Sequence, residues 1–173
     1  MKSEGRLSPA DAETPKVITV RDGFTLAVAQ GDIAKPRFLE FDPDGTLYVS
    51  LPGEGKIKSC RDSDGDGYYE TVADFVTDRR TAHAMQWHDG WLWFTQTDAV
   101  LRARDTDDDG KADETQTILS DLPGGGGHWW RSLLIHDGRL YTSVGDSGNI
   151  TASDGERQRI FSFAVDGSDK QLF

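Results

Sequence analysis

The chain has 173 residues, of which 36% are hydrophobic and 10% aromatic, and this length and composition suit one globular domain. Its net charge of −11 at pH 7 argues against nucleic acid or an anionic membrane as a partner, because both would be repelled. No stretch approaches the ~20 apolar residues of a membrane span, and the single cysteine, Cys60, excludes an internal disulfide.

The N-terminal part of the chain is expected to differ from the rest. Residues 1–15 are polar and contain proline, so we predict a disordered tail there, with no apolar core of a signal peptide. Residues 16–173 are expected to fold. Within them, the apolar stretches 16–20 and 24–29 flank Asp22-Gly23 and predict a first pair of strands.

One hairpin sequence then occurs three times. The copies are FLEFDPDGTLYVS at 38–50, AMQWHDGWLWFT at 84–95 and SLLIHDGRLYTS at 132–143. Each turns at an Asp-Gly pair, which tolerates the positive φ of a tight hairpin turn, and each precedes a second pair of predicted strands. The residues just before the copies, Arg37, His83 and Arg131, lie 46 (83 − 37) and 48 (131 − 83) positions apart. This period, with four strands per unit, is typical of a β-propeller.

The predicted fold class is therefore all-β, a partial β-propeller of four-stranded antiparallel blades. We place three blades at approximately 37–80, 83–124 and 128–173. A β-sandwich of many hairpins is the alternative, but a sandwich has no reason to repeat at a fixed period. Since propellers usually have ~4 to 8 blades, the chain is expected to be either a fragment that lacks C-terminal blades or a half-ring that forms a homodimer.

Two acidic loops share the pattern D-x-D-x-D-G-x-x-[DE]. The predicted ligands are Asp62, Asp64, Asp66, the Tyr68 carbonyl and Glu70 in the first loop, and Asp105, Asp107, Asp109, the Lys111 carbonyl and Asp113 in the second. Alternating carboxylates with glycine at the sixth position let a loop curl around a hard cation, which suits Ca²⁺. The twelfth residues, Ala73 and Gln116, exclude EF-hands. We expect structural calcium sites, and the alternative is a pair of solvated acidic turns.

The candidate chemistry lies in residues 124–149. Four glycines precede His128, Trp129, Trp130 and Arg131, which lead into a predicted strand, and the next strand ends in GDSGN. We expect these two polar clusters to lie one at each end of the hairpin. His128 is a candidate general base. The tryptophans would stack on a flat ring or pack between blades, and Asp146 would orient a catalytic group or close an Asx-turn.

The repeat places Arg37, His83 and Arg131 at equivalent strand-start positions. Because inner strands line the channel of a propeller, these residues predict a ring of basic groups at one channel mouth. Such a ring would suit an anionic ligand, since guanidinium groups bind carboxylate or phosphate with two hydrogen bonds. The alternative is that the arginines pair with acids such as Glu40 or Asp146 across blades.

The segment GGGGHWWRSLLIHDGRLYTSVGDSGN resembles the corresponding segment of the glucose/sorbosone dehydrogenases. These are soluble quinoproteins with a six-bladed propeller that use pyrroloquinoline quinone (PQQ) and Ca²⁺. By position, His128 resembles the base that takes the hydroxyl proton while hydride passes to the quinone, and Asp146 is the second candidate catalytic residue. The carboxylates of PQQ would explain the basic mouth. The implied cofactor-binding residues are Arg131, Arg37, His83, Trp129 and Asn149.

The resemblance implies oxidation of an aldose-type sugar or alcohol, with periplasmic or secreted placement. The later blades of that family, which carry further cofactor and calcium ligands, are absent, so a lone three-blade chain is expected to be inactive. A non-catalytic, calcium-stabilised module that binds a partner or glycan is the first alternative. A calcium-dependent hydrolase ranks last, because such propellers hold their metal with inward acids and the strand-start positions here are basic.

Overall fold

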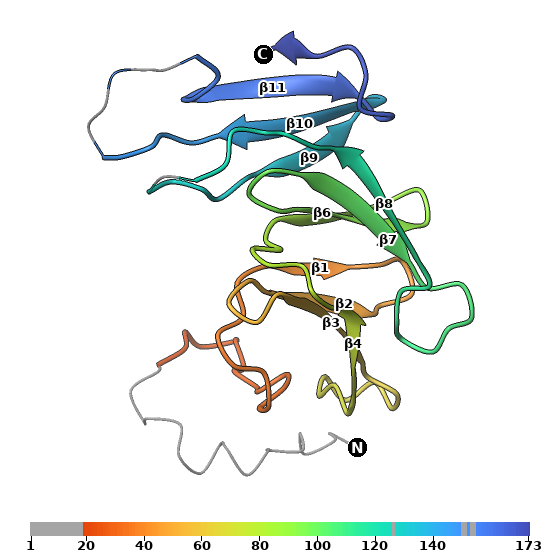
Figure 1. Ribbon diagram of the computed structural model, residues 1–173. Helices are drawn as coiled ribbons and strands as arrows, with labels where there is room; N and C mark the ends of the chain where they lie inside the picture. Colours follow the sequence, from red (N-terminus) through yellow and green to blue (C-terminus); the bar gives the residue numbers. More distant parts are fainter. Residues whose placement is uncertain (1–18, 126, 150–151, 153–154) are drawn as a thin grey trace.

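The computed structural model describes residues 19–125, 127–149, 152 and 155–173, and these form three four-stranded antiparallel sheets (Figure 1). The first sheet contains β1 (Leu39–Phe41), β2 (Leu47–Leu51), β3 (Lys56–Arg61) and β4 (Thr71–Val76). The second contains β5 (Met85–His88), β6 (Trp91–Thr95), β7 (Val100–Arg104) and β8 (Glu114–Leu119). The third contains β9 (Leu133–His136), β10 (Arg139–Val144), β11 (Arg159–Ala164) and β12 (Gln171–Leu172).

The three sheets are the blades of a partial β-propeller, as the repeat predicted. Within each sheet every strand pairs with the next one along the chain. The first strands of the sheets meet, since β1 contacts β5 and β5 contacts β9, and the sheets stack in chain order like a fan (Figure 1). The described residues contain no helix, and so none that is long and apolar enough to cross a membrane.

The hydrophobic core lies mainly between neighbouring blades. One cluster joins Tyr48, Ile57 and Phe75 of the first sheet to Met85 and Leu92 of the second. The next joins Trp93 and Val100 of the second sheet to Ile135, Leu140 and Phe161 of the third. The second sheet presents apolar side chains on both of its faces, and burial of such faces drives the stacking of the sheets.

A repeated hydrogen bond fixes the start of each inner strand. In every blade, a hydroxyl at the end of the second strand accepts the backbone N–H one residue after the strand-start position. The three pairs are Ser50 with Phe38 (3.0 Å), Thr95 with Ala84 (3.2 Å) and Ser143 with Ser132 (3.1 Å). Arg37, His83 and Arg131 therefore precede their strands in equivalent positions.

Two of the three hairpin turns have the left-handed conformation that their Asp-Gly pairs predict. Both residues of Asp89-Gly90 (φ 50° and 75°) and of Asp137-Gly138 (φ 47° and 73°) are left-handed, as a type I′ turn requires. The first hairpin differs, because Pro43 fixes a negative φ and only Gly45 has a positive value (90°). Its loop closes instead through Gly45 N–H donating to the Asp42 carbonyl (3.2 Å).

The strand pair predicted at 16–29 is wrong for the residues that the structure describes. Residues 19–36 contain no strand, and the Phe24 N–H donates to the Arg21 carbonyl (3.0 Å) in a local turn. Phe24 and Leu26 are well exposed, so no neighbouring surface covers their apolar side chains, and an uncovered two-stranded hairpin is only marginally stable. The tail predicted at 1–15 lies outside the described residues, as do residues 16–18.

Candidate functional site

The two polar clusters of the third blade lie together, at the end of the hairpin opposite its turn. Because β9 and β10 are antiparallel, with Arg139 opposite His136 at the turn, the start of β9 lies beside the end of β10. The Gly127 N–H donates to the Ser147 carbonyl (2.9 Å), just beyond the strands. The expectation that the clusters lie at opposite ends was therefore wrong, and the correction brings the candidate residues within reach of one another.

His128 is an exposed residue held by an amide. Its Nε2 lies 2.9 Å from Asn149 Oδ1. An amide oxygen can only accept a hydrogen bond, so Nε2 carries the hydrogen and Nδ1 of the uncharged ring carries the lone pair. Asn149 thereby selects the tautomer in which Nδ1 can accept a proton.

The backbone of Asp146 is hydrogen-bonded to the backbone of His128, and the Asp146 carboxylate contacts other residues. The His128 N–H donates to the Asp146 carbonyl (3.2 Å). One carboxylate oxygen accepts the Ser147 N–H (2.6 Å) and the other accepts Gln158 Nε2 (2.6 Å). These contacts organise the turn after β10, and a catalytic role for Asp146 stays a prediction.

Sequence reasoning missed two residues that shape this end of the blade. Arg157 donates from Nη2 to the Gly124 carbonyl (2.8 Å) and from Nη1 to the Gly125 carbonyl (3.3 Å). Gln158 binds Asp146, as described above. Their partners lie 12 to 33 positions earlier in the chain, so no local sequence pattern could have indicated these contacts.

The strand-start residues of three blades meet in one aromatic and basic cluster, which we call the strand-start cluster. It consists of Arg37, His83, Trp129, Trp130 and Arg131. The Trp129 and Trp130 rings stack with centroids 3.7 Å apart. His83 lies 4.0 Å from the Trp130 ring, and the Arg37 guanidinium lies 4.7 Å from its centroid. The Trp130 ring thus contacts three side chains, those of Arg37, His83 and Trp129. This leaves the Trp129 ring for stacking of a flat ligand.

Arg131 and His83 are buried within this cluster. Arg131, 2% exposed, donates from Nε to the Thr97 carbonyl (2.9 Å) and from Nη2 to the Pro123 carbonyl. His83 Nδ1 lies 3.3 Å from the Arg131 carbonyl. Arg131 Nη1 and His83 Nε2 are buried without a hydrogen-bond partner among the described residues. Of the three predicted basic residues, only Arg37 is exposed.

Neither buried group pairs with the acids considered above. Glu40 instead accepts the Trp87 N–H (2.8 Å). Burial lowers the pKa of the Arg131 guanidinium, with Arg157 as the next cause. Burial also lowers the pKa of His83 below its ordinary value of 6.5, although the hydrogen bond to Arg131 opposes this shift. An unpartnered buried donor is costly, so Nη1 offers a contact to an anionic ligand.

The first acidic loop gathers four carboxylates. One oxygen from each of Asp62, Asp64, Asp66 and Glu70 lies within 4.8 Å of the others. Asp62 accepts the Gly67 N–H (2.8 Å) and the Gly65 N–H (2.7 Å), which lower its pKa. Glu70 Oε2 accepts both Ser63 N–H and Oγ (3.1 Å each), while Oε1 is buried without a partner among the described residues. The loop is therefore already curled around a common centre.

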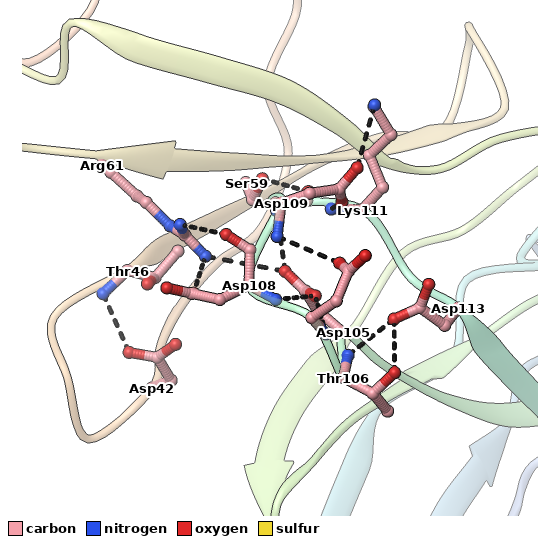
Figure 2. Close-up of polar contacts among 12 residues, drawn as sticks. Asp42, Thr46, Ser59, Arg61, Asp105, Thr106, Asp108, Asp109, Lys111 and Asp113 are labelled. Carbon is pink, nitrogen blue, oxygen red and sulfur yellow. Dashed lines mark hydrogen bonds and ion pairs between the residues drawn. The ribbon is translucent and has the colours of Figure 1, made fainter.

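The second acidic loop repeats this design with two differences. Asp105, Asp107 and Asp109 converge within 4.8 Å, but Asp113 is not part of the converging set. Asp113 accepts Thr106 N–H and Oγ1 (2.7 Å each), and Lys111 Nζ lies 3.1 Å from Asp109 (Figure 2). A cation at this loop would have to displace the lysine, so the first loop offers the more complete oxygen shell.

The second loop also bridges two blades. Arg61 of β3 donates to the Asp108 carboxylate (2.6 Å) and carbonyl (3.0 Å), and Ser59 Oγ donates to the Gly110 carbonyl (2.6 Å), as Figure 2 shows. Beside these contacts lies a cleft of about 680 Å³ whose acidic lining includes Asp42 and Asp105. This cleft would repel an anionic cofactor, whereas the strand-start cluster carries basic groups and is the candidate cofactor site.

Comparison with known proteins places the chain among propellers. The family model described as "Domain of unknown function (DUF7133)" matches residues 10–172. No curated protein matches the chain. The holo PQQ domain of pyranose dehydrogenase from Coprinopsis cinerea is 20% identical, with a TM-score of 0.71 over 86% of this chain and 38% of that one.

Two further solved structures share the fold. The PQQ-bound aldose sugar dehydrogenase from Streptomyces coelicolor is 16% identical, with a TM-score of 0.62 over 83% of this chain and 48% of that one. The calcium structure of a Trichoderma reesei carbohydrate-active enzyme of family AA12 is 18% identical, with a TM-score of 0.60 over 75% and 35%. The chain spans between about a third and a half of these proteins, and the likeness shows their fold.

The depressed pKa of His83 predicts a pH dependence of stability. The unfolded chain takes up this proton more readily than the folded one, so stability is full above the unfolded pKa of 6.5 and falls as pH drops through that value toward the lower folded pKa. We expect Tm to fall between about pH 7.5 and about pH 5.5, above the ordinary range of carboxylates. His83→Gln should flatten this slope, whereas the exposed His136→Gln should keep it. An unchanged slope in His83→Gln would contradict the assignment.

We predict that Gly145 does not tolerate a side chain, because it packs against the His128 backbone. A Cβ at this position would lie 2.2 Å from the His128 carbonyl oxygen, so Gly145→Ala must displace the His128 backbone. We expect a loss of about 1–3 kcal/mol in unfolding free energy and a changed His128 ring environment by NMR. The matched control is Gly127→Ala, whose Cβ would meet only ordinary contacts at 3.6 Å or more. Equal stability of the two variants would argue against the packing described here.

Proposed function

The chain belongs to the DUF7133 family, a domain of unknown function, and from its propeller fold and the residues of the candidate site we propose that it is part of a quinoprotein dehydrogenase. The proposed reaction is oxidation of an aldose-type sugar or similar alcohol with PQQ and calcium, in a periplasmic or secreted protein. The observation that carries the proposal is the 2.9 Å contact that holds His128 to Asn149 next to the strand-start cluster. Two of the proteins that share this fold have PQQ sites.

The residues present fit PQQ in kind. PQQ is planar and carries three carboxylates. Arg37 has an exposed guanidinium, and Arg131 Nη1 is a buried donor without a partner among the described residues. We assign these two groups to carboxylates and Trp129 to the ring face. His83 supports the set, because it packs on Trp130 and contacts the Arg131 carbonyl.

His128 acts as the general base in this proposal. Asn149 fixes Nε2 as the hydrogen-bearing nitrogen, so Nδ1 accepts the proton of the substrate hydroxyl. PQQ, when bound, would accept the hydride that leaves the carbon bearing that hydroxyl. Asn149 is thus a positioning residue for the tautomer of His128.

The function is tested in the intact protein that contains this chain, loaded with PQQ and Ca²⁺. We expect dye reduction with an aldose or alcohol, and His128→Gln should lower kcat by about 10²–10⁴-fold while PQQ binding is retained. His136→Gln, at the exposed β9–β10 turn, should leave kcat unchanged. If His128→Gln also lost PQQ binding, His128 would be a structural residue and not the general base. Absence of any dye reduction with a panel of sugars and alcohols would overturn the function.

We assign structural calcium to the two acidic loops. The converging carboxylates described above, with the Tyr68 and Lys111 carbonyls, give the oxygen-only ligands that Ca²⁺ prefers. Three or four clustered carboxylates repel one another unless a cation compensates them. Glu70 Oε1, which is buried and has no hydrogen-bond partner in the part of the chain that the structure describes, makes the first loop the better match.

Calcium titration checks this assignment. We expect two bound ions per chain by calorimetry and, at a free calcium concentration of about 100 Kd, a stabilisation of about 2.7 kcal/mol per site. Asp66→Asn and Asp109→Asn should each remove one site, and the exposed Glu54→Gln should remove none. If calcium neither binds the wild-type protein nor raises its Tm, the loops are solvated acidic turns.

A further inference from the structure

Thr81, in the segment between the first two blades, has a backbone conformation that its side chain disfavours. Its φ is 66°, in the left-handed region that β-branched residues rarely adopt, because the side chain then crowds the backbone. Glycine or asparagine would adopt this conformation more easily. Strain of this kind persists only where the surrounding structure holds the residue in place. The contacts of Thr81 therefore indicate its role.

The hydroxyl of Thr81 uses its full hydrogen-bonding capacity. It donates to the Arg80 carbonyl (2.5 Å) and accepts both the Thr97 N–H and the Thr97 hydroxyl (3.1 Å each). A hydroxyl has one donor and two acceptor sites, so all three are in use. Gln96 Nε2 also donates to the Arg80 carbonyl (2.7 Å). Thr81 and its neighbour thus fix the start of the turn that joins β6 to β7.

This β6–β7 turn in its own right holds the segment that enters the third blade. The Thr97 carbonyl accepts Arg131 Nε (2.9 Å), and the Asp98 carbonyl accepts the Leu122 N–H (2.9 Å). Arg131 is 2% exposed, and its Nη1 has no hydrogen-bond partner among the described residues. The Thr97 carbonyl orients the guanidinium group that carries Nη1. Because Thr81 holds Thr97, the direction of Nη1 depends on the Thr81 hydroxyl.

The equivalent turn of the first blade is fixed differently. Ser50 and Thr95 make the same hydrogen bond in their blades, so Pro52 is equivalent to Thr97, two positions later in each case. The Pro52 carbonyl accepts the Thr81 N–H (3.3 Å), which is a backbone donor, whereas the Thr97 carbonyl accepts a charged side chain. Proline fixes its own φ. Thr97 lacks that constraint and is held by the Thr81 hydroxyl instead.

We infer that Thr81 is a positioning residue for Arg131, and that its strained conformation serves to hold the Thr97 carbonyl against the Arg131 guanidinium. Thr81 acts through Thr97, by two hydrogen-bonded steps in series. The consequence for the ligand rests on the proposed function, in which Arg131 Nη1 binds a carboxylate of PQQ. The positioning itself rests on these contacts alone and is measurable without the cofactor.

Two substitutions separate the hydroxyl from the strain. Thr81→Ser keeps the hydroxyl and removes the β-branch, whereas Thr81→Ala removes both. In the intact protein that contains this chain, with Ca²⁺ present, we expect Thr81→Ser to keep the wild-type Kd for PQQ with an equal or higher Tm. Thr81→Ala should weaken PQQ binding about tenfold, the order expected when a charge-assisted hydrogen bond is misplaced. Thr117→Ala, at an exposed position of β8, should leave the Kd unchanged.

NMR of the PQQ-free protein tests the positioning alone. The Arg131 Nε–H signal, assigned through its side-chain carbons, should exchange with solvent about tenfold faster in Thr81→Ala, since one order of magnitude corresponds to a typical net hydrogen bond. In Thr81→Ser it should exchange at the wild-type rate. If Thr81→Ala does not fold by circular dichroism, Thr81→Gly replaces it, because glycine accepts the left-handed φ without a hydroxyl.

The two readouts separate this inference from the proposed function. A wild-type exchange rate in Thr81→Ala, or equal acceleration in Thr81→Ser and Thr81→Ala, overturns the positioning role. Loss of Tm in Thr81→Ala with an unchanged Kd for PQQ would make Thr81 a merely structural residue. Wild-type protein that binds no PQQ overturns the proposed function, and the exchange rates then still decide whether Thr81 positions Arg131.

Discussion

Burial of apolar side chains between neighbouring sheets is the interaction on which this structure depends. Two of the clusters of buried apolar side chains in the described part of the chain join neighbouring blades, and Ile57, Leu92 and Val100 are fully buried in them. The strand register that buries them also fixes where every inner strand starts. The strand-start cluster is therefore a consequence of blade packing, because three blades must stack before Arg37, His83 and Trp130 can meet.

The candidate site depends both on strand pairing within the third blade and on a contact between the third and second blades. Antiparallel pairing of β9 and β10 brings His128 beside the turn that carries Asn149, and the buried Arg131 ties the preceding glycine-rich segment to the Thr97 carbonyl of the second blade. The proposed base and the proposed anion contacts thus lie on segments that these hydrogen bonds hold together. Proton transfer and cofactor orientation require such defined placement.

The repeated features of the fold were predictable from the sequence, and the isolated ones were not. The Asp-Gly turns and the spacing of Arg37, His83 and Arg131 gave the blades, since they recur at one period. The burial of His83 and Arg131 escaped prediction because it depends on contacts between blades that no local pattern encodes. Arg157 and Gln158 were missed for the same reason. The strand pair predicted at 16–29 had apolar stretches around a turn signal, but in the described residues 19–29 no neighbour covers Phe24 and Leu26, and propensity alone did not suffice.

We propose that the strand-start cluster binds a planar, polyanionic quinone beside His128. The most direct measurement is a titration of the intact protein with PQQ, followed by quenching of tryptophan fluorescence in the presence of Ca²⁺. We expect saturable quenching, with Trp129 as the main reporter, that Arg37→Ala weakens and that Arg21→Ala, at an exposed position outside the cluster, leaves unchanged. Quenching that does not saturate, or that both variants alter equally, would contradict a specific quinone site at this position.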